Sequence, residues 1–350
     1  MSLLLKHLGW NDYFSAQALK YGIGQVYRVT EDFGQRFVVS GVTDGQLTTH
    51  DLIFARRNQQ APIIGDWIVG MPVESGAVEF IALLERASCF QRGGEAQQVQ
   101  ARAANIDRLF IVTSCTDEFN VSRLERYILL ARANRLAPVI VLNKADLAAD
   151  LMFYIGQLAE LGQEIPLCVL SAFSTTDVAQ LKNLMHEGET CAFVGSSGVG
   201  KSSIVNALIG SDQQLTLAVS AKGARGSHTT TNRSLFLLPG RGVIIDTPGI
   251  RSVGVTAGGD NLNDVFEDIA ILMTQCAFRN CGHNGEVGCA LSRAVEEGLL
   301  TLRRLNSYKK LRREAAYFDD RDEARRQQGN EGKQRAARRS SRERFEREPR

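Results

Sequence analysis

The eight residues Gly195–Ser202, which read GSSGVGKS, constrain the fold of this chain more than any other segment. They follow a short apolar strand-like stretch, Cys191–Val194, and precede a helix-like run, Ser202–Ile209. In a strand–loop–helix of this kind, the glycines let successive backbone N–H groups turn inward and form an anion-binding nest at a helix N-terminus. An ordinary glycine-rich turn is the alternative, but the flanking strand and helix favour a phosphate-binding loop.

Individual residues of this loop have defined places in the prediction. Lys201 would reach the β- and γ-phosphates of a nucleotide, and Ser202 would offer its hydroxyl to Mg²⁺. Because the backbone wraps the phosphates, the expected nucleotide-binding residues are the whole loop and one residue beyond it: Gly195, Ser196, Ser197, Gly198, Val199, Gly200, Lys201, Ser202 and Ser203.

Around the loop, strand-like and helix-like patterns alternate. Residues 122–136 have helical spacing, with a shared apolar face made by Leu124, Tyr127, Ile128, Ala131 and Leu136. Four apolar segments resemble buried parallel strands: 108–112, 139–142, 166–170 and 191–194. The alternation predicts a multidomain α/β protein whose middle domain, residues 105–258, is a doubly wound parallel sheet.

Two short motifs follow strands of this sheet and predict a guanine site. Asn143-Lys144-Ala145-Asp146 comes directly after one strand, and Ser171-Ala172 follows the next. The Asp146 carboxylate can accept hydrogen bonds from guanine N1–H and N2–H₂, a pair of donors that adenine lacks. A backbone N–H of Ser171 or Ala172 would meet guanine O6. The alternative for Asp146 is a role as a helix N-cap only.

A third motif, Asp246-Thr247-Pro248-Gly249, follows the strand-like segment 242–245. Asp246 is predicted to hold Mg²⁺ through water, and the Gly249 N–H to contact the γ-phosphate and so respond to its loss.

The segment GARGSHTTTN, residues 223–232, precedes that motif and is expected to be mobile. A threonine hydroxyl there would complete the Mg²⁺ shell; Thr230 is the first choice, and Thr229 and Thr231 stay open. An ordinary Ser/Thr turn is the alternative.

These are the five motifs of GTPases, in an unusual order. Ordinary GTPases run phosphate loop, switch threonine, DxxG, NKxD and SA, whereas here NKAD and SA come first. The sequence therefore predicts a circularly permuted P-loop GTPase domain, which keeps its sheet if the old termini are bridged at the surface. The DTPG loop then leads directly into the C-terminal part of the chain, so γ-phosphate sensing should be coupled to that part.

Ile250 stands where many GTPases carry the glutamine that orients the attacking water. Its side chain cannot hydrogen-bond water, so intrinsic hydrolysis should be slow unless another group helps. His228 is the candidate catalytic residue, together with Lys201 and Gly249, because a neutral imidazole can orient or deprotonate water. A solvated loop histidine is the alternative.

Residues 1–90 predict a small all-β barrel or sandwich, which is a candidate RNA-binding domain. Five short β-rich segments are separated by turn glycines: 25–30, 36–40, 47–55, 66–72 and 78–84. Five strands suit an OB-fold, an architecture that often binds nucleic acid. Arg56 and Arg57 are the candidate RNA-contacting patch, and Trp67 is assigned to the core rather than to base stacking. Residues 91–104, polar and glycine-containing, are predicted to be a linker.

Near the C-terminus, Cys276, Cys281, His283 and Cys289 form the pattern C-x₄-C-x-H-x₅-C. Three thiolates and an imidazole at this spacing suit one tetrahedral, structural Zn²⁺, and four protein ligands leave no position for a catalytic water.

Residues 259–318 are predicted to be a helical zinc-binding domain, with helices over 261–273, 291–297 and 299–318. In the last of these, Leu299, Leu302 and Leu305 form the expected apolar stripe. A basic face is expected to stay outside and to contact RNA phosphates: Arg303, Arg304, Lys309, Lys310, Arg312 and Arg313. A solvated, salt-bridged face is the alternative.

Charge and composition narrow the setting of the chain. Residues 303–350 hold 17 Lys/Arg and 9 Asp/Glu, against 24 and 30 in the remainder, an asymmetry that points this end toward a polyanion. Residues 319–350 are predicted to be a disordered charged tail. Seven unevenly placed cysteines, no secretory signal and no apolar run long enough for a bilayer predict a cytoplasmic protein without a membrane partner.

Nearly the whole chain, about residues 8–318, resembles the RsgA/YjeQ family of small-ribosomal-subunit-dependent GTPases. The permuted NKAD, SA, GSSGVGKS, HTTT and DTPGI set carries the resemblance, with Gly65-Asp66-Trp67 and the Cys/His cluster. The resemblance implies an OB-fold over residues 1–90 that binds RNA or the ribosome, a permuted GTPase domain, a zinc domain, and GTP hydrolysis stimulated by the 30S subunit during its late maturation. Ile250 and His228 match the family's hydrophobic replacement and its proposed catalytic histidine.

The leading interpretation is therefore a monomeric GTPase that converts GTP to GDP and acts with the 30S subunit and its 16S rRNA. A GTP-dependent RNA-binding module with negligible hydrolysis is the alternative, to which Ile250 lends weight.

Overall fold

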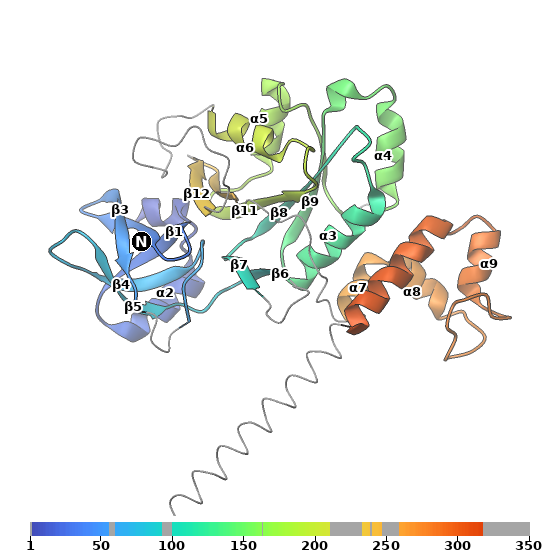
Figure 1. The fold of residues 1–350 in the computed structure, drawn as a ribbon, viewed down its shortest axis with the longest axis horizontal. Coiled ribbons are helices and arrows are strands. Elements are labelled where there is room, and N and C mark those ends of the chain that lie inside the picture. The colour runs from blue at the N-terminus through green and yellow to red at the C-terminus, as the bar shows by residue number, and fades with distance from the viewer. Residues whose placement is uncertain are drawn as a thin grey trace, which may run out of the picture. The chain divides into compact units, whose positions relative to one another are not determined.

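The computed structural model describes residues 2–55, 60–92, 100–162, 164–210, 233–238, 240–246 and 259–317. The chain divides into two compact units, residues 1–254 and 255–350, which are described separately. Figure 1 shows the elements of both units along the chain.

The first unit begins with a closed five-stranded barrel, as the sequence predicted. Its strands are β1 (Gln25–Asp32), β2 (Phe37–Thr43), β3 (Gln46–Ile53), β4 (Trp67–Pro72) and β5 (Val78–Leu83). They are ordered β1-β2-β3-β5-β4, and pairing of β4 with β1 closes the barrel. The β2–β3 hairpin turns at Asp44-Gly45, where φ is 51° and 75°, the positive values that an Asp-Gly turn of this type requires.

Trp67, on β4, has no solvent exposure, which confirms its assignment as a buried residue. Its ring makes an edge contact with Trp10, with ring centroids 4.8 Å apart. Trp10 belongs to a helical N-terminal segment that the strand-based interpretation of residues 1–90 missed: α1 (Leu3–His7), α2 (Asp12–Ala18) and η1 (Leu19–Tyr21). These helices are too short for a periodic signal; Asn11, whose side chain accepts a hydrogen bond from the Phe14 N–H, is the local cue for α2.

The first unit continues into the predicted doubly wound sheet. Its parallel strands are, in spatial order, β10 (Leu167–Val169), β9 (Ala137–Asn143), β8 (Arg108–Ser114), β11 (Glu189–Gly195) and β13 (Gly242–Asp246). A further strand that the sequence did not predict, β12 (Arg233–Leu238), pairs antiparallel with β13.

Helices cover both faces of this sheet: α3 (Val121–Ala133), α4 (Leu151–Ala159), α5 (Thr175–Asn183) and α6 (Lys201–Gly210). Figure 1 shows α5 and α6 on one face and α3 on the other. Side chains alternate along the strands, so that Phe110, Val112 and Phe193 join the core with α5 and α6. The predicted apolar face of α3 is buried as a whole, because Leu124, Tyr127, Ile128, Ala131 and Leu136 are all nearly inaccessible.

Residues 91–104, predicted as a linker, contain regular structure. Strand β6 (Cys89–Arg92) pairs antiparallel with β7 (Gln100–Ala104). The Ala104 N–H donates to the Ile64 carbonyl at 2.9 Å, so this ribbon is bonded to the segment that leads into β4. The polar composition of this segment does not predict strands. The two partners are also separated in sequence by residues 93–99, which lie outside the described part of the chain.

The barrel and the α/β sheet are joined by direct backbone pairing. Strand β1 pairs antiparallel with β12 at Glu31–Ser234 and Asp32–Arg233, and Arg233 also forms an ion pair with Asp32 at 2.9 Å. A continuous sheet of eleven strands therefore runs through the first unit.

Arg28, on β1, is the second connection and is only 1% exposed. Its guanidinium donates to the Leu8 carbonyl and, at 2.7 Å, to the hydroxyl of Thr190, the residue after Glu189 in β11. Burial lowers the pKa of Arg28 to about 10, opposed by the charges of Asp107 and Asp66. The cation thus binds the N-terminal helices, the barrel and the α/β sheet to one another.

Replacing Arg28 by Leu is expected to lower the free energy of unfolding by about 3–5 kcal/mol, because buried acceptors and carboxylates lose their cation. The measurement is urea unfolding of the full chain. The control is Arg36→Leu, which removes a pair with Asp51 at 2.7 Å between side chains that are 65% and 53% exposed, and which should cost no more than about 1 kcal/mol. Equal losses in the two variants would contradict a connecting role for Arg28.

The second unit is helical, with α7 (Gly259–Val265), α8 (Glu267–Met273), α9 (Ala290–Glu296) and a helix over 302–317. The single helix predicted over 261–273 is broken between α7 and α8 at Phe266, whose ring is fully buried.

The predicted apolar stripe of the last helix is wrong. Leu299 and Leu302 are 74% and 60% exposed, and only Leu305 of the three is buried. Arg304, predicted to stay outside, is buried instead, because its guanidinium forms a bidentate pair with Asp268 at 2.7 Å and lies over the Phe266 ring. The buried face runs on through Tyr308, Leu311 and Ala315.

Candidate functional site

The predicted nucleotide motifs begin at one edge of the parallel sheet. Strands β9, β10, β11 and β13 are parallel to one another or to a shared neighbour, so their carboxyl ends lie at the same edge. Asn143 ends β9, Ser171 follows β10, Gly195 ends β11 and Asp246 ends β13. Ligands of doubly wound sheets bind outside this edge.

The loop Gly195–Gly200 has the backbone that a phosphate nest requires. Gly195 and Gly200 have φ of 148° and 95°, which favours glycine at both positions. A Cβ on Gly195 would lie 2.2 Å from the Val112 carbonyl oxygen, so the loop packs directly against the end of β8. The Lys201 ammonium, at the start of α6, donates to the carbonyls of Gly195, at 2.8 Å, and Ser196.

One buried side chain joins three of the motifs. The Asn143 amide nitrogen donates to the Val199 carbonyl at 2.8 Å, and its amide oxygen accepts from the Ala172 N–H at 3.1 Å. Asn143 is 1% exposed, so neither bond competes with water. The phosphate loop, the NKAD motif and the SA motif, which lie far apart in the sequence, are thereby fixed relative to one another.

The part of the site that is predicted to bind guanine combines an exposed carboxylate with backbone N–H groups that are already hydrogen-bonded. Lys144 has a φ of 59°, and this left-handed residue turns the chain into the short helix η2 (Ala145–Leu147), which carries the exposed Asp146. The two N–H groups expected to meet guanine O6 are already used: Ser171 donates to Asp177 at 2.9 Å, and Ala172 donates to Asn143. The next N–H, that of Phe173, makes only a long bond of 3.4 Å to the Ser171 hydroxyl.

The charges of Lys201 and Asp246 affect each other at the candidate phosphate site. Desolvation raises the pKa of the Asp246 carboxyl, and the nearby Lys201 ammonium opposes that rise. Ser202, in the first turn of α6, and Asp246, at the end of β13, offer a hydroxyl and a carboxylate, and oxygen donors of this kind are those that Mg²⁺ prefers.

Several predicted residues lie outside the described part of the chain: Arg56, Arg57, His228, Thr229, Thr230, Thr231, Gly249 and Ile250. Their roles stay predictions.

Replacing Gly200 by Ala is expected to weaken GTP binding about 5–150-fold, from backbone strain of about 1–3 kcal/mol. The added Cβ would lie 2.2 Å from the Asn143 amide nitrogen at a φ of 95°, so the bond that joins the phosphate loop to NKAD must break. Titration with a fluorescent GTP analogue measures the effect. Gly210→Ala is the control, because a Cβ there meets nothing within 4 Å; unchanged affinity in Gly200→Ala would contradict the argument.

The second unit holds the predicted metal ligands in one cluster. The donor atoms of Cys276, Cys281, His283 and Cys289 all lie within 4.8 Å of one another. The His283 Nδ1 is 3.6 Å from the Cys276 sulfur and 3.8 Å from the Cys289 sulfur. A tetrahedral zinc ion with ordinary bond lengths places its donors about 3.5–3.8 Å apart, so the four residues fit this ion.

Glu286 supports the metal-binding loop from outside the ligand set. Its carboxylate accepts from the Asn284 N–H at 2.6 Å and lies 3.7 Å from the Cys281 sulfur. Ligand spacing alone does not predict this support, because the carboxylate acts on the backbone between two ligands.

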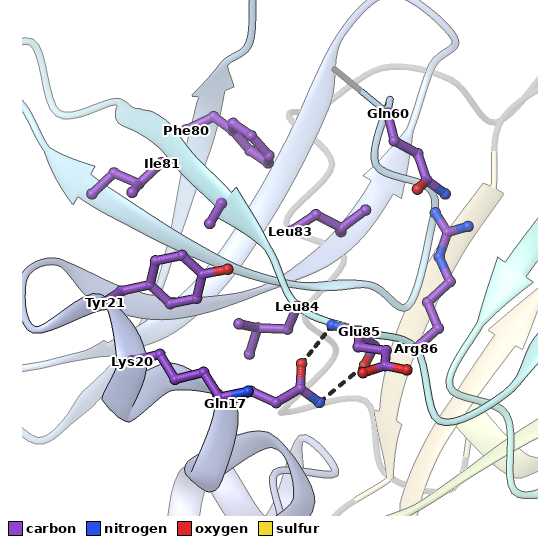
Figure 2. Close-up of a pocket in the computed structure, with 11 residues that line it drawn as sticks. Gln17, Lys20, Tyr21, Gln60, Phe80, Ile81, Leu83, Leu84, Glu85 and Arg86 are labelled. Atoms are coloured by element: carbon purple, nitrogen blue, oxygen red, sulfur yellow. Dashed lines mark hydrogen bonds between the residues drawn. The ribbon is translucent and has the colours of Figure 1, made fainter. Parts of the chain in front are cut away.

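A separate pocket of about 640 Å³ lies on the barrel, between the α2–η1 segment and β5. Figure 2 shows Gln17 at this pocket, where it accepts from the Glu85 N–H at 2.6 Å and donates to the Glu85 carbonyl at 3.3 Å. Arg86 also lines the pocket, but its guanidinium forms a bidentate pair with the fully buried Asp66 at 2.7 Å. None of the described lining residues belongs to the nucleotide motifs.

Arg123, on α3, contacts the phosphate loop through the Ser196 hydroxyl, a contact that the sequence motifs do not predict. Among the residues that the structure describes, no helix has both the length and the apolar character needed to cross a bilayer.

Comparison with known proteins identifies similar sequences over most of the chain. The family model described as RsgA GTPase matches residues 83–256. The small ribosomal subunit biogenesis GTPase RsgA 2 of Vibrio parahaemolyticus is 37% identical over 325 residues, covering 89% of this chain and 86% of that protein. The small ribosomal subunit biogenesis GTPase RsgA of Methanosarcina acetivorans is 38% identical over 265 residues, covering 75% and 72%.

Solved structures show the same fold. YjeQ from Thermotoga maritima matches with a TM-score of 0.62 and 25% identity, covering 83% of this chain and 98% of that one. YloQ, described as a circularly permuted GTPase, matches with a TM-score of 0.61 and 24% identity, covering 85% and 96%. These similarities confirm the permuted α/β fold that the motif order predicted.

Proposed function

Because this chain belongs to the RsgA GTPase family, we propose that it hydrolyses GTP to GDP and phosphate during maturation of the small ribosomal subunit. Stimulation by the 30S subunit, contact with 16S rRNA, and a link between nucleotide state and ribosome binding are the finer parts of this proposal. The protein would act in the cytoplasm as a monomer.

Guanine would be read by Asp146, whose carboxylate accepts from N1–H and N2–H₂. Lys144 and Ala145 hold this residue in place, and Asn143 ties it to the phosphate loop through Val199. Guanine O6 would take the N–H of Phe173, because its bond of 3.4 Å is the longest at the SA motif and costs least to release.

The triphosphate would lie in the nest of backbone N–H groups over Gly195–Ser203, with Lys201 turning from its carbonyl partners to the β- and γ-phosphates. Ser202, Asp246 and Thr230 would hold Mg²⁺, which when bound offsets the charge that develops on the phosphate oxygens. The backbone N–H of Gly249 would contact the γ-phosphate.

Hydrolysis needs a group that orients the attacking water. The Ile250 side chain cannot form hydrogen bonds, so His228 is the candidate for this role. A neutral imidazole in that place would accept a proton from the attacking water.

The second unit would carry a structural Zn²⁺ on its Cys₃His cluster. Its last helix keeps part of the predicted basic face available, since Lys310 and Arg313 are exposed. These cations would contact RNA phosphates, a contribution that weakens as salt rises.

The single observation that carries the proposal is the buried Asn143 amide, which joins the phosphate loop to both base-recognition motifs. The test is GTP hydrolysis by the full chain with and without purified 30S subunits, together with sedimentation of the complex in GDP and in a non-hydrolysable GTP analogue. Strong stimulation, with binding that depends on the nucleotide, supports the proposal. Binding that depends on GTP without turnover supports the alternative, a GTP-dependent RNA-binding module.

A further inference from the structure

We propose that Arg123 is a positioning residue for GTP hydrolysis, which acts by holding Ser196 and with it the first turn of the phosphate loop. This inference rests on the proposed function. No sequence motif assigns Arg123 a role, because it lies on a helix 73 residues before Ser196.

The contact brings a second cation to the phosphate loop. The Arg123 guanidinium donates to the Ser196 hydroxyl, while the Lys201 ammonium donates to the carbonyl of the same residue. Two positive groups thus meet at one loop residue. Glu118 pairs with Arg123 at 3.2 Å but is half exposed, and the Asp246 carboxyl acts on Lys201, so these carboxylates offset the repulsion only in part. A bound triphosphate supplies the negative charge that offsets both cations.

Arg123 is fixed at its base. It lies in the first turn of α3, where its backbone N–H donates to the Asn120 side chain at 2.9 Å, the N-cap of the helix. The apolar face of the same helix is buried, so the helix cannot shift without losing that packing. The guanidinium therefore reaches Ser196 from a rigid support.

The loop that leads into α3 belongs to the same network as the base-recognition motifs. The Cys115 N–H donates to the Asn143 carbonyl at 3.0 Å, and the Asn143 side chain bonds to Val199 in the phosphate loop. Asn143 thus fixes the far end of the phosphate loop, and Arg123 fixes the near end at Ser196. Removing Arg123 releases the Ser196 side chain, so that near this end the loop keeps only the backbone pairing of Gly195 and the Lys201 bonds to the Gly195 and Ser196 carbonyls.

A loop whose Ser196 side chain is released can shift the N–H groups that face the γ-phosphate. Because small displacements of positioned groups reduce turnover by up to about 10²-fold, the expected signature is a lower kcat with a smaller change in KM. The preference for GTP over GDP should fall as well, since only GTP has the γ-phosphate that those groups contact.

The test is a double-mutant cycle on the full chain with Arg123→Met, Ser196→Ala and the double variant. We expect each single change to lower kcat about 10–100-fold, and the double variant to be no slower than the worse single one, because both changes remove the same contact. The ratio of GTP to GDP affinity should fall in all three. Arg132→Met, at the other end of α3, is the matched control and should keep wild-type values.

Losses that multiply in the double variant would overturn the proposal, because Arg123 and Ser196 would then act separately. A lower urea midpoint in Arg123→Met with unchanged kcat and unchanged affinity ratio would also overturn it, because Arg123 would then be only structural. Ser196→Ala removes a single loop hydroxyl, so it keeps the test informative if Arg123→Met folds poorly. If the wild-type chain shows no turnover, the proposed function fails, and the affinity ratios still decide the role of Arg123.

Discussion

An Asp146→Asn variant is expected to lose GTP affinity about 10³–10⁵-fold and to bind xanthosine triphosphate (XTP) in its place. Asparagine puts an N–H₂ donor opposite the N2 amine of guanine, so two donors face each other without an acceptor, and discrimination of this order follows from such unpaired groups. Xanthine carries a carbonyl at that position, which accepts the new donor. Competition of GTP, XTP and ATP against a fluorescent nucleotide measures the change.

The control for this prediction lies four residues further along the chain. Asp150 caps α4 by accepting from the Phe153 N–H at 3.1 Å, so Asp150→Asn makes the same chemical change at a carboxylate that only caps a helix. Its base preference should stay that of the wild type. If Asp146→Asn also kept its preference for GTP, Asp146 would be a cap like Asp150 and would not read the base.

Removing one metal ligand should unfold the second unit and leave the first intact. In Cys281→Ser, the zinc content should fall from one ion per chain to well below one, and residues 259–317 should become sensitive to protease. The helices α7, α8 and α9 have seven residues each, too short to be stable alone. Structural zinc supplies about 10–16 kcal/mol of apparent binding free energy in small domains, so the remaining packing of this unit cannot replace it.

Metal analysis, limited proteolysis and GTP titration on the full chain test this prediction together. Cys89→Ser is the matched control, because Cys89 is a partly exposed cysteine outside the cluster. It should keep its zinc, whereas a strong chelator added to the wild type should reproduce the Cys281→Ser pattern. A Cys281→Ser protein that kept one zinc per chain and resisted protease would show that Cys281 is not a ligand.

The predictions that held best were those in which local pattern and tertiary environment agree. The five barrel strands and the apolar face of α3 are set by side-chain alternation and helical spacing, and each face met the core that its pattern required. The Cys/His cluster was predictable for a similar reason, since four metal-ligating side chains within fourteen positions have few ways to meet other than around an ion.

The last helix shows where local pattern fails. Leucines at 299, 302 and 305 make a plausible stripe, but the face that packs inward runs from Arg304 through Tyr308 to Ala315. Two adjacent faces of a helix differ by only about 100° of rotation about its axis. The face that includes Arg304 packs inward because Arg304 contacts Asp268 and Phe266, which lie at the neighbouring helix α8.

The sequence by itself determined the chemistry of this protein: the phosphate loop, the order of the motifs that revealed a permuted sheet, and the Cys/His ligand set. Those features are short and depend on residue type at fixed spacing. Only the tertiary structure decided how the parts are held together, through the Asn143 bonds, Arg28 between the barrel and the sheet, the β1–β12 pairing, and Arg123 on the phosphate loop. Each of these contacts joins residues at least 29 positions apart, and no local period or spacing encodes which distant partner a buried polar group will find.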